Sequence, residues 1–220
     1  MAPLDKTLGH CQPKAAASTG QYDTSNIGHD SSPRKWEREY GNVAGMSLPL
    51  PDRSFPAYSY VPGKFPHPLS DPAGHSFGHV PEKCEPLTPE NCQRHEEYLW
   101  GIQLFNQGYY WEAHETWEQV WHACGRKGPA ADYSKGLIKL AAAGVKTREG
   151  RPEGVARHAN RSAELLRNVK VSFGGSNVAP FGLSLEPIIK NAEYVAANAD
   201  QFMNTSTAAV ATTLPPLPEA

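Results

Sequence analysis

Residues 106–121, NQGYYWEAHETWEQVW, restrict the fold more than any other stretch of this chain. On a helix, which turns by about 100° per residue, one face of this stretch would be apolar. That face carries Tyr110, Ala113, Trp117, Val120, Trp121 and Cys124. A second face carries Trp111, His114, Glu115, Glu118 and His122. Because aromatic side chains occupy both faces, the helix is expected to pack between neighbours inside a bundle.

Residues that favour helix starts and helix ends define five predicted helices. Thr88-Pro89-Glu90 combines an N-cap, a proline at the first helical position and an early acid. Glycines provide most of the predicted helix ends. The predicted helices cover about residues 88–107, 109–124, 132–149, 152–170 and 185–198. No stretch alternates convincingly as a strand does. The predicted fold is therefore all-α, a compact antiparallel bundle of about five helices.

Composition divides the rest of the chain. Residues 1–50 are polar, without a sustained period, and are predicted to be disordered. Residues 51–87 are rich in proline and aromatics, which favours an extended arm packed on the bundle domain, residues 88–202. The tail, residues 203–220, is predicted to be disordered. We also consider that residues 55–81 plug a groove of the bundle and bury their aromatic side chains.

Net charge and cysteine content limit which kinds of partner the protein is expected to bind and in which cellular compartment it is expected to lie. The net charge of −2 and the pI near 6.5 provide no field that would attract nucleic acid or an anionic membrane. No run approaches the roughly 20 apolar residues of a membrane span. The first residues contain no apolar run, so a secretory signal is not expected. Four cysteines without a Cys-x-x-Cys pair favour free thiols in a reducing cytoplasm. We therefore expect a cytoplasmic protein that binds neither nucleic acid nor membrane.

A polar cluster is the main candidate site. His114, Glu118 and His122 follow i, i+4, i+8 spacing and rise from one side of the second helix. The third helix presents a lysine stripe that ends at Lys146, and His158 of the fourth points toward the core side. The predicted cluster lines a groove between the second, third and fourth helices. Its members are Glu112, His114, Glu115, Glu118, Lys146 and His158.

The cluster has three possible uses. Glu and His at helical spacing can hold a divalent metal, but HETWE places Glu118 where the His-Glu-x-x-His zinc pattern has its second histidine. Crowded carboxylates can also serve as general acids or bases. The use that we favour is a structural network with His158, Arg161 or the lysine stripe, so neither a metal ligand nor a cofactor is expected.

A second possible zinc set lies mainly in the arm. It consists of His67, His75, His79, Cys84 and Cys92. The cysteines lie eight residues apart, unlike the close pairs of structural zinc sites, so histidine hydrogen bonds to the backbone are favoured instead.

The stretch FNQGYYWEAHETWEQVW, followed by YSKGLIKLAAAGVKTREGRPEGVARHANRSAELL, resembles the bacterial family named domain of unknown function 309. The resemblance covers about residues 99–166. The family pattern falls on Asn106, Gly108, Tyr110, Glu112, His114, Glu115, Glu118 and Trp121. It implies a small all-α bundle and no established activity. Lys135 and Lys139 stand where family members often carry glutamine, which weakens any analogy for the third helix.

These patterns favour a non-enzymatic binding or interaction module whose partner is an unknown small molecule or protein. The alternative is a metal-dependent hydrolase or related enzyme that uses His114, Glu115 and Glu118, with His158 as a further ligand or acid/base group. An oligomer is compatible with either hypothesis.

Overall fold

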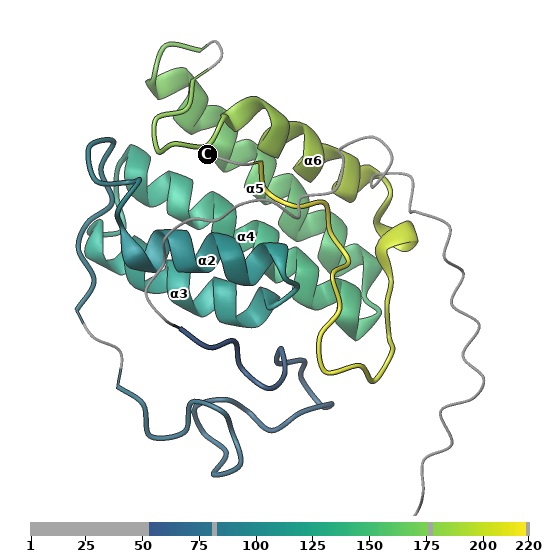
Figure 1. The fold of residues 1–220 in the computed structure, drawn as a ribbon. Coiled ribbons are helices and arrows are strands. Elements are labelled where there is room, and N and C mark those ends of the chain that lie inside the picture. Colours follow the sequence, from purple (N-terminus) through teal and green to yellow (C-terminus); the bar gives the residue numbers. More distant parts are fainter. Residues whose placement is uncertain (1–52, 81–82, 176–177, 219–220) are drawn as a thin grey trace, which may run out of the picture.

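The computed structural model describes residues 53–80, 83–175 and 178–218, and the predicted disordered segment 1–50 lies outside them. The described residues form five α-helices and one short 3₁₀ helix, and they contain no strand. The elements are α2 (Glu96–Asn106), α3 (Tyr110–Ala123), α4 (Pro129–Glu149), α5 (Pro152–Ser172), α6 (Leu185–Ala197) and η1 (Ala199–Phe202). Consecutive helices pack side by side, which confirms the predicted all-α bundle (Figure 1). None of these helices is long and apolar enough to cross a membrane.

The apolar face of α3 forms much of the core, as its periodicity predicts. Tyr110, Ala113, Trp117 and Val120 are all buried. Trp121 is only half-buried, and the ammonium of Lys135 lies 5.0 Å from the centre of its ring. Gly144, the last residue of GLIKLAAAG, allows α4 to approach α3 closely. A Cβ at this position would lie 2.4 Å from Cγ of the Tyr110 ring.

The first predicted helix begins later than expected. Residues 89–94 form turns, and α2 starts at Glu96. Thr88 and Asn91 exchange hydrogen bonds, because each backbone N–H donates to the side-chain oxygen of the other residue. Such side-chain bonds compete with helix formation. The N-cap of α2 is His95 instead, whose Nδ1 accepts a hydrogen bond from the Tyr98 N–H.

The tail differs most from the prediction, because its described residues, 203–218, pack on the bundle instead of being disordered. Leu214 and Leu217 are buried. The Tyr110 hydroxyl accepts hydrogen bonds from the backbone N–H groups of Thr213 (2.7 Å) and Leu214 (2.8 Å). Asn106 likewise accepts the N–H of Leu217. The stabilising partners all lie far away in sequence, so the polar composition of the tail gives no sign of them.

The arm lies against α2 and α3. Phe55 packs on Trp100 and Tyr109, and Tyr60 meets Trp111 edge to face. Phe77 is 53% exposed, so not every aromatic of the arm is buried as a plug would require. The arm, in blue, and the tail, in yellow, run along the outside of the helices (Figure 1). The two segments meet where the Ser59 N–H donates to the Ala209 carbonyl.

Candidate functional site

Glu112, in the first turn of α3, holds the arm. Its buried carboxylate accepts hydrogen bonds from Ser59 Oγ (3.0 Å) and from the Tyr60 N–H (2.8 Å). His75 Nε2 lies 3.1 Å from the same carboxylate. The Glu112 carboxylate therefore binds the arm. The sequence grouped Glu112 with His114, Glu115 and Glu118, but its hydrogen bonds are with arm residues.

Arg148, in the last turn of α4, is a second buried charge that sequence reasoning missed. Only 1% of the residue is exposed, and Nη2 donates to the Ala208 carbonyl of the tail. Burial lowers the pKa of this guanidinium, while Tyr110 and Glu112 oppose that shift. Lys64 of the arm donates to the carbonyls of Arg148 and Thr205. Basic residues are common in the last turn of a helix. The position of Arg148 in the sequence therefore does not indicate that its side chain is buried.

His114, Glu115 and Glu118 do come together on α3. One ligand-type atom from each residue lies within 4.8 Å of the others. His114 Nδ1 is 3.4 Å from Glu115 Oε1, which is within ion-pair distance. The alignment does not make a hydrogen bond, and the buried Nδ1 has no hydrogen-bond partner among the described residues. The two side chains are 28% and 34% exposed, so the cluster lies at the edge of the bundle.

The structural network favoured from the sequence does not form around these carboxylates. Lys146 binds Glu149 and Arg161 binds Glu164, each three residues along its own helix. Lys135 lies over the Trp121 ring. Among the residues described, no lysine or arginine lies within ion-pair distance of Glu115 or Glu118. Lys146 and Arg161 each bind a nearer carboxylate, so in the described part of the chain His114 is the one basic side chain within ion-pair distance of either carboxylate.

His158 of α5 is half-buried and interacts electrostatically with His114. Burial lowers the pKa of His158 to about 4, and the charges of Lys139, Arg157, Lys146 and His114 add to this effect. Its imidazole is therefore neutral at pH 7. Sequence reasoning placed His158 near the polar face of α3, and among the described residues it makes no hydrogen bond or ion pair with Glu115 or Glu118.

The lowered pKa of His158 predicts acid sensitivity. The group titrates near pH 6.5 in the unfolded chain and near 4 in the folded protein, so the unfolded state binds the extra proton between these values. The free energy of unfolding of metal-free protein should fall as the pH drops from 6.5 to 4. Urea unfolding across this interval should show a smaller fall for His158→Gln, and an unchanged fall for the exposed control His122→Gln. An equal fall in wild type and His158→Gln would contradict the assignment.

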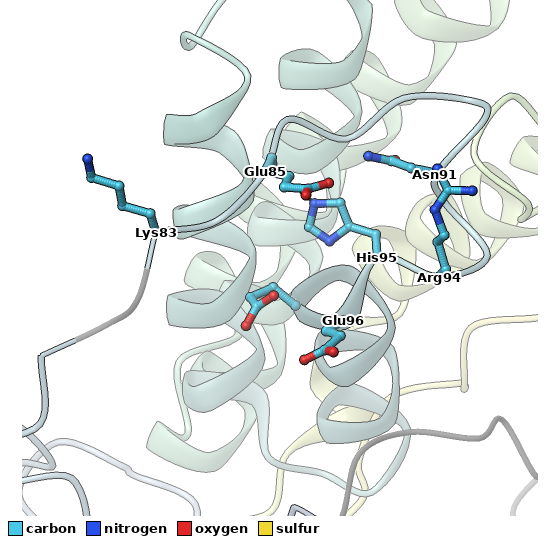
Figure 2. Close-up of a pocket in the computed structure, with 7 residues that line it drawn as sticks. Lys83, Glu85, Asn91, Arg94, His95 and Glu96 are labelled. Carbon is cyan, nitrogen blue, oxygen red and sulfur yellow. The ribbon is translucent and has the colours of Figure 1, made fainter.

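A cavity lies at the start of α2, where sequence reasoning placed no site. Its lining residues are Lys83, Glu85, Asn91, Arg94, His95, Glu96 and Glu97 (Figure 2). Both ring nitrogens of His95 are engaged, since Nδ1 accepts from Tyr98 and Nε2 therefore donates to the Glu85 carbonyl at 2.9 Å. Burial raises the pKa of the neighbouring Cys84 thiol to about 12. His95 thus caps a helix, and the Cys84–His95–Glu97 group is poorly suited to bind a metal ion.

The second possible zinc set, which the sequence disfavoured, does not converge among the described residues. His67 Nδ1 accepts from the N–H groups of Leu69 and Ser70, which is the backbone role favoured from the sequence. Cys92 donates to the Pro89 carbonyl. In the described part of the chain, neither group of convergent ligand atoms includes an arm histidine.

Residues 98–158 match the model of a protein family described as "Domain of unknown function (DUF309)". The matched segment contains most of α2, all of α3 and α4, and the first turns of α5. It includes the α3 cluster, His158, Glu112 and Arg148, whereas the arm and the tail lie outside it. A comparison with curated proteins found no match.

Proposed function

We propose that this domain, whose residues 98–158 match the DUF309 model, is a non-enzymatic binding module. Its contact surface is the α3 cluster, which we define as His114, Glu115 and Glu118, with His158 of α5 beside it. The ligand is positively charged. The observation that carries this proposal is the convergence of two carboxylates and an imidazole within 4.8 Å without a lysine or arginine partner among the described residues.

Electrostatics supports a cationic ligand. Two like charges about 4 Å apart repel by about 1 kcal/mol in bulk water and by about 4 kcal/mol near a protein surface. A chain folded only for stability would place Lys146 or Arg161 against these carboxylates, yet both cations pair elsewhere. Retention of unfavourable charge at one place is typical of binding sites, where function opposes stability.

Solvent exposure supports binding more than catalysis. Glu115 is about one-third exposed and His114 slightly less, so water reaches both side chains. Enzymes ordinarily enclose the reacting groups and exclude water. The cavity at the start of α2 is lined by other residues. The hydrolase alternative uses the same cluster, but no feature of the cluster favours hydrolysis over binding.

The proposal predicts that Glu118→Gln leaves metal-free protein as stable as wild type or stabilises it by up to about 1 kcal/mol. Glu118 makes no ion pair among the described residues, so its substitution relieves repulsion from Glu115 and breaks none of the described ion pairs. Glu149→Gln is the matched control because Glu149 is bound by Lys146 and Arg151. It should destabilise by about 1–2 kcal/mol. Urea unfolding with a chelator present measures both, and a loss above about 1 kcal/mol in Glu118→Gln would indicate a structural network instead.

A further inference from the structure

We propose that the cation bound by the α3 cluster is a divalent transition-metal ion, coordinated by Nδ1 of His114 and by one carboxylate oxygen each from Glu115 and Glu118. This inference rests on the proposed binding function and names its ligand class. One imidazole nitrogen and two carboxylates form a donor set that suits Zn²⁺ and its neighbours among the first-row metals.

The spacing of the donor atoms fits a metal ion. Atoms held at about 2.0–2.2 Å from a tetrahedral zinc ion stand about 3.3–3.6 Å apart. His114 Nδ1 and Glu115 Oε1 are already 3.4 Å apart. Glu118 lies one helical turn beyond His114, on the same side of α3, and one of its carboxylate oxygens is within 4.8 Å of a ring nitrogen of His114 and of a carboxylate oxygen of Glu115. A small side-chain rotation would complete a three-residue set that leaves one position for water.

The orphaned nitrogen of His114 separates a metal ion from an organic cation. Nδ1 is buried and has no hydrogen-bond partner, a state that proteins rarely leave uncompensated. An ammonium could donate to the same three atoms, but at hydrogen-bond distances of about 2.8 Å it would hold them roughly 4.6 Å apart. His114 Nδ1 and Glu115 Oε1 are closer together than that, at 3.4 Å. A metal ion uses the nitrogen lone pair and both carboxylates together. Mg²⁺ and Ca²⁺ prefer oxygen ligands alone, so the imidazole favours a transition metal.

Calorimetric titration of full-length, chelator-treated protein with Zn²⁺ tests the inference. We expect one equivalent to bind, with affinity at least tenfold weaker in His114→Ala. His122→Ala is the matched control, because His122 lies on the same helix, is exposed and bonds Arg126. It should bind like wild type. Circular dichroism verifies that each variant is folded, and Glu118→Gln provides a second loss-of-ligand variant should His114→Ala fail to fold.

Co²⁺ spectroscopy distinguishes the α3 cluster from the Cys84–His95–Glu97 group. A site of nitrogen and oxygen donors gives visible ligand-field bands without thiolate-to-metal charge transfer. Those bands should persist in Cys84→Ser and vanish in His114→Ala. A charge-transfer band lost in Cys84→Ser, equal binding in wild type and His114→Ala, or no stoichiometric binding would overturn the metal assignment. The binding-module proposal is tested separately, by the metal-free stability of Glu118→Gln.

Discussion

Glu112→Ala is expected to release the arm and to lower the free energy of unfolding by about 3 kcal/mol. The substitution removes a buried acceptor for three groups of the arm, Ser59 Oγ, the Tyr60 N–H and His75 Nε2. Left in place, those donors would be buried without partners. If the arm detaches, these donors bind water instead. The loss in the free energy of unfolding is then limited to the contribution of arm docking.

Limited chymotrypsin digestion measures this release directly. The bonds after Tyr58 and Tyr60 are expected to be cleaved faster in Glu112→Ala than in wild type, and urea unfolding reports the lost stability. Glu97→Gln is the control, because this more exposed carboxylate also holds the arm, through Arg53. Such surface pairs contribute about 0–1 kcal/mol. Cleavage at the wild-type rate in Glu112→Ala would show that other contacts hold the arm.

Gly144→Ala is expected to destabilise the protein by about 1–3 kcal/mol, the usual range for an overpacked core. The added methyl would lie 2.4 Å from Cγ of the Tyr110 ring, which is fully buried. Ring displacement also disturbs the tail, because the Tyr110 hydroxyl accepts the N–H groups of Thr213 and Leu214. Alanine in a helix otherwise favours stability over glycine by about 1 kcal/mol, so packing must reverse the sign.

Gly154→Ala is the matched control for this effect. It also lies in a helix, and its Cβ would meet the side chain of Lys146 at 3.0 Å. A flexible lysine can move, so this variant should be as stable as wild type or more stable. Thermal unfolding followed by circular dichroism compares the two substitutions. Equal stability of Gly144→Ala and wild type would mean that α3 and α4 separate without cost.

Helix positions were largely predictable because they depend on local features. Gly150 adopts the left-handed backbone that ends α4, and Pro152 starts α5, as local preference predicts. The periodicity of α3 correctly predicted that Trp117 and Tyr110 are buried. The predicted start of the first helix, at Thr88, was wrong. Thr88 and Asn91 form hydrogen bonds with each other in a turn, and helix propensity alone does not reveal such a turn.

The candidate site was predictable only in part. Helical spacing gathered His114, Glu115 and Glu118, since residues on one turn are neighbours in any helix. Spacing also grouped Glu112 with them, although its partners come from the arm more than 35 residues away in sequence. The expected partners of the cluster, Lys146 and Arg161, instead pair along their own helices.

The sequence by itself determined the all-α class, the order of the helices and the face of α3 that forms the core, because these follow from local periodicity and helix-end residues. Only the tertiary structure decided that Glu112 and Arg148 hold the arm and the tail, and that no lysine or arginine of the described residues pairs with Glu115 or Glu118. The physical reason is that hydrogen bonds and ion pairs of buried charges depend on which distant segments meet. No local pattern encodes that meeting.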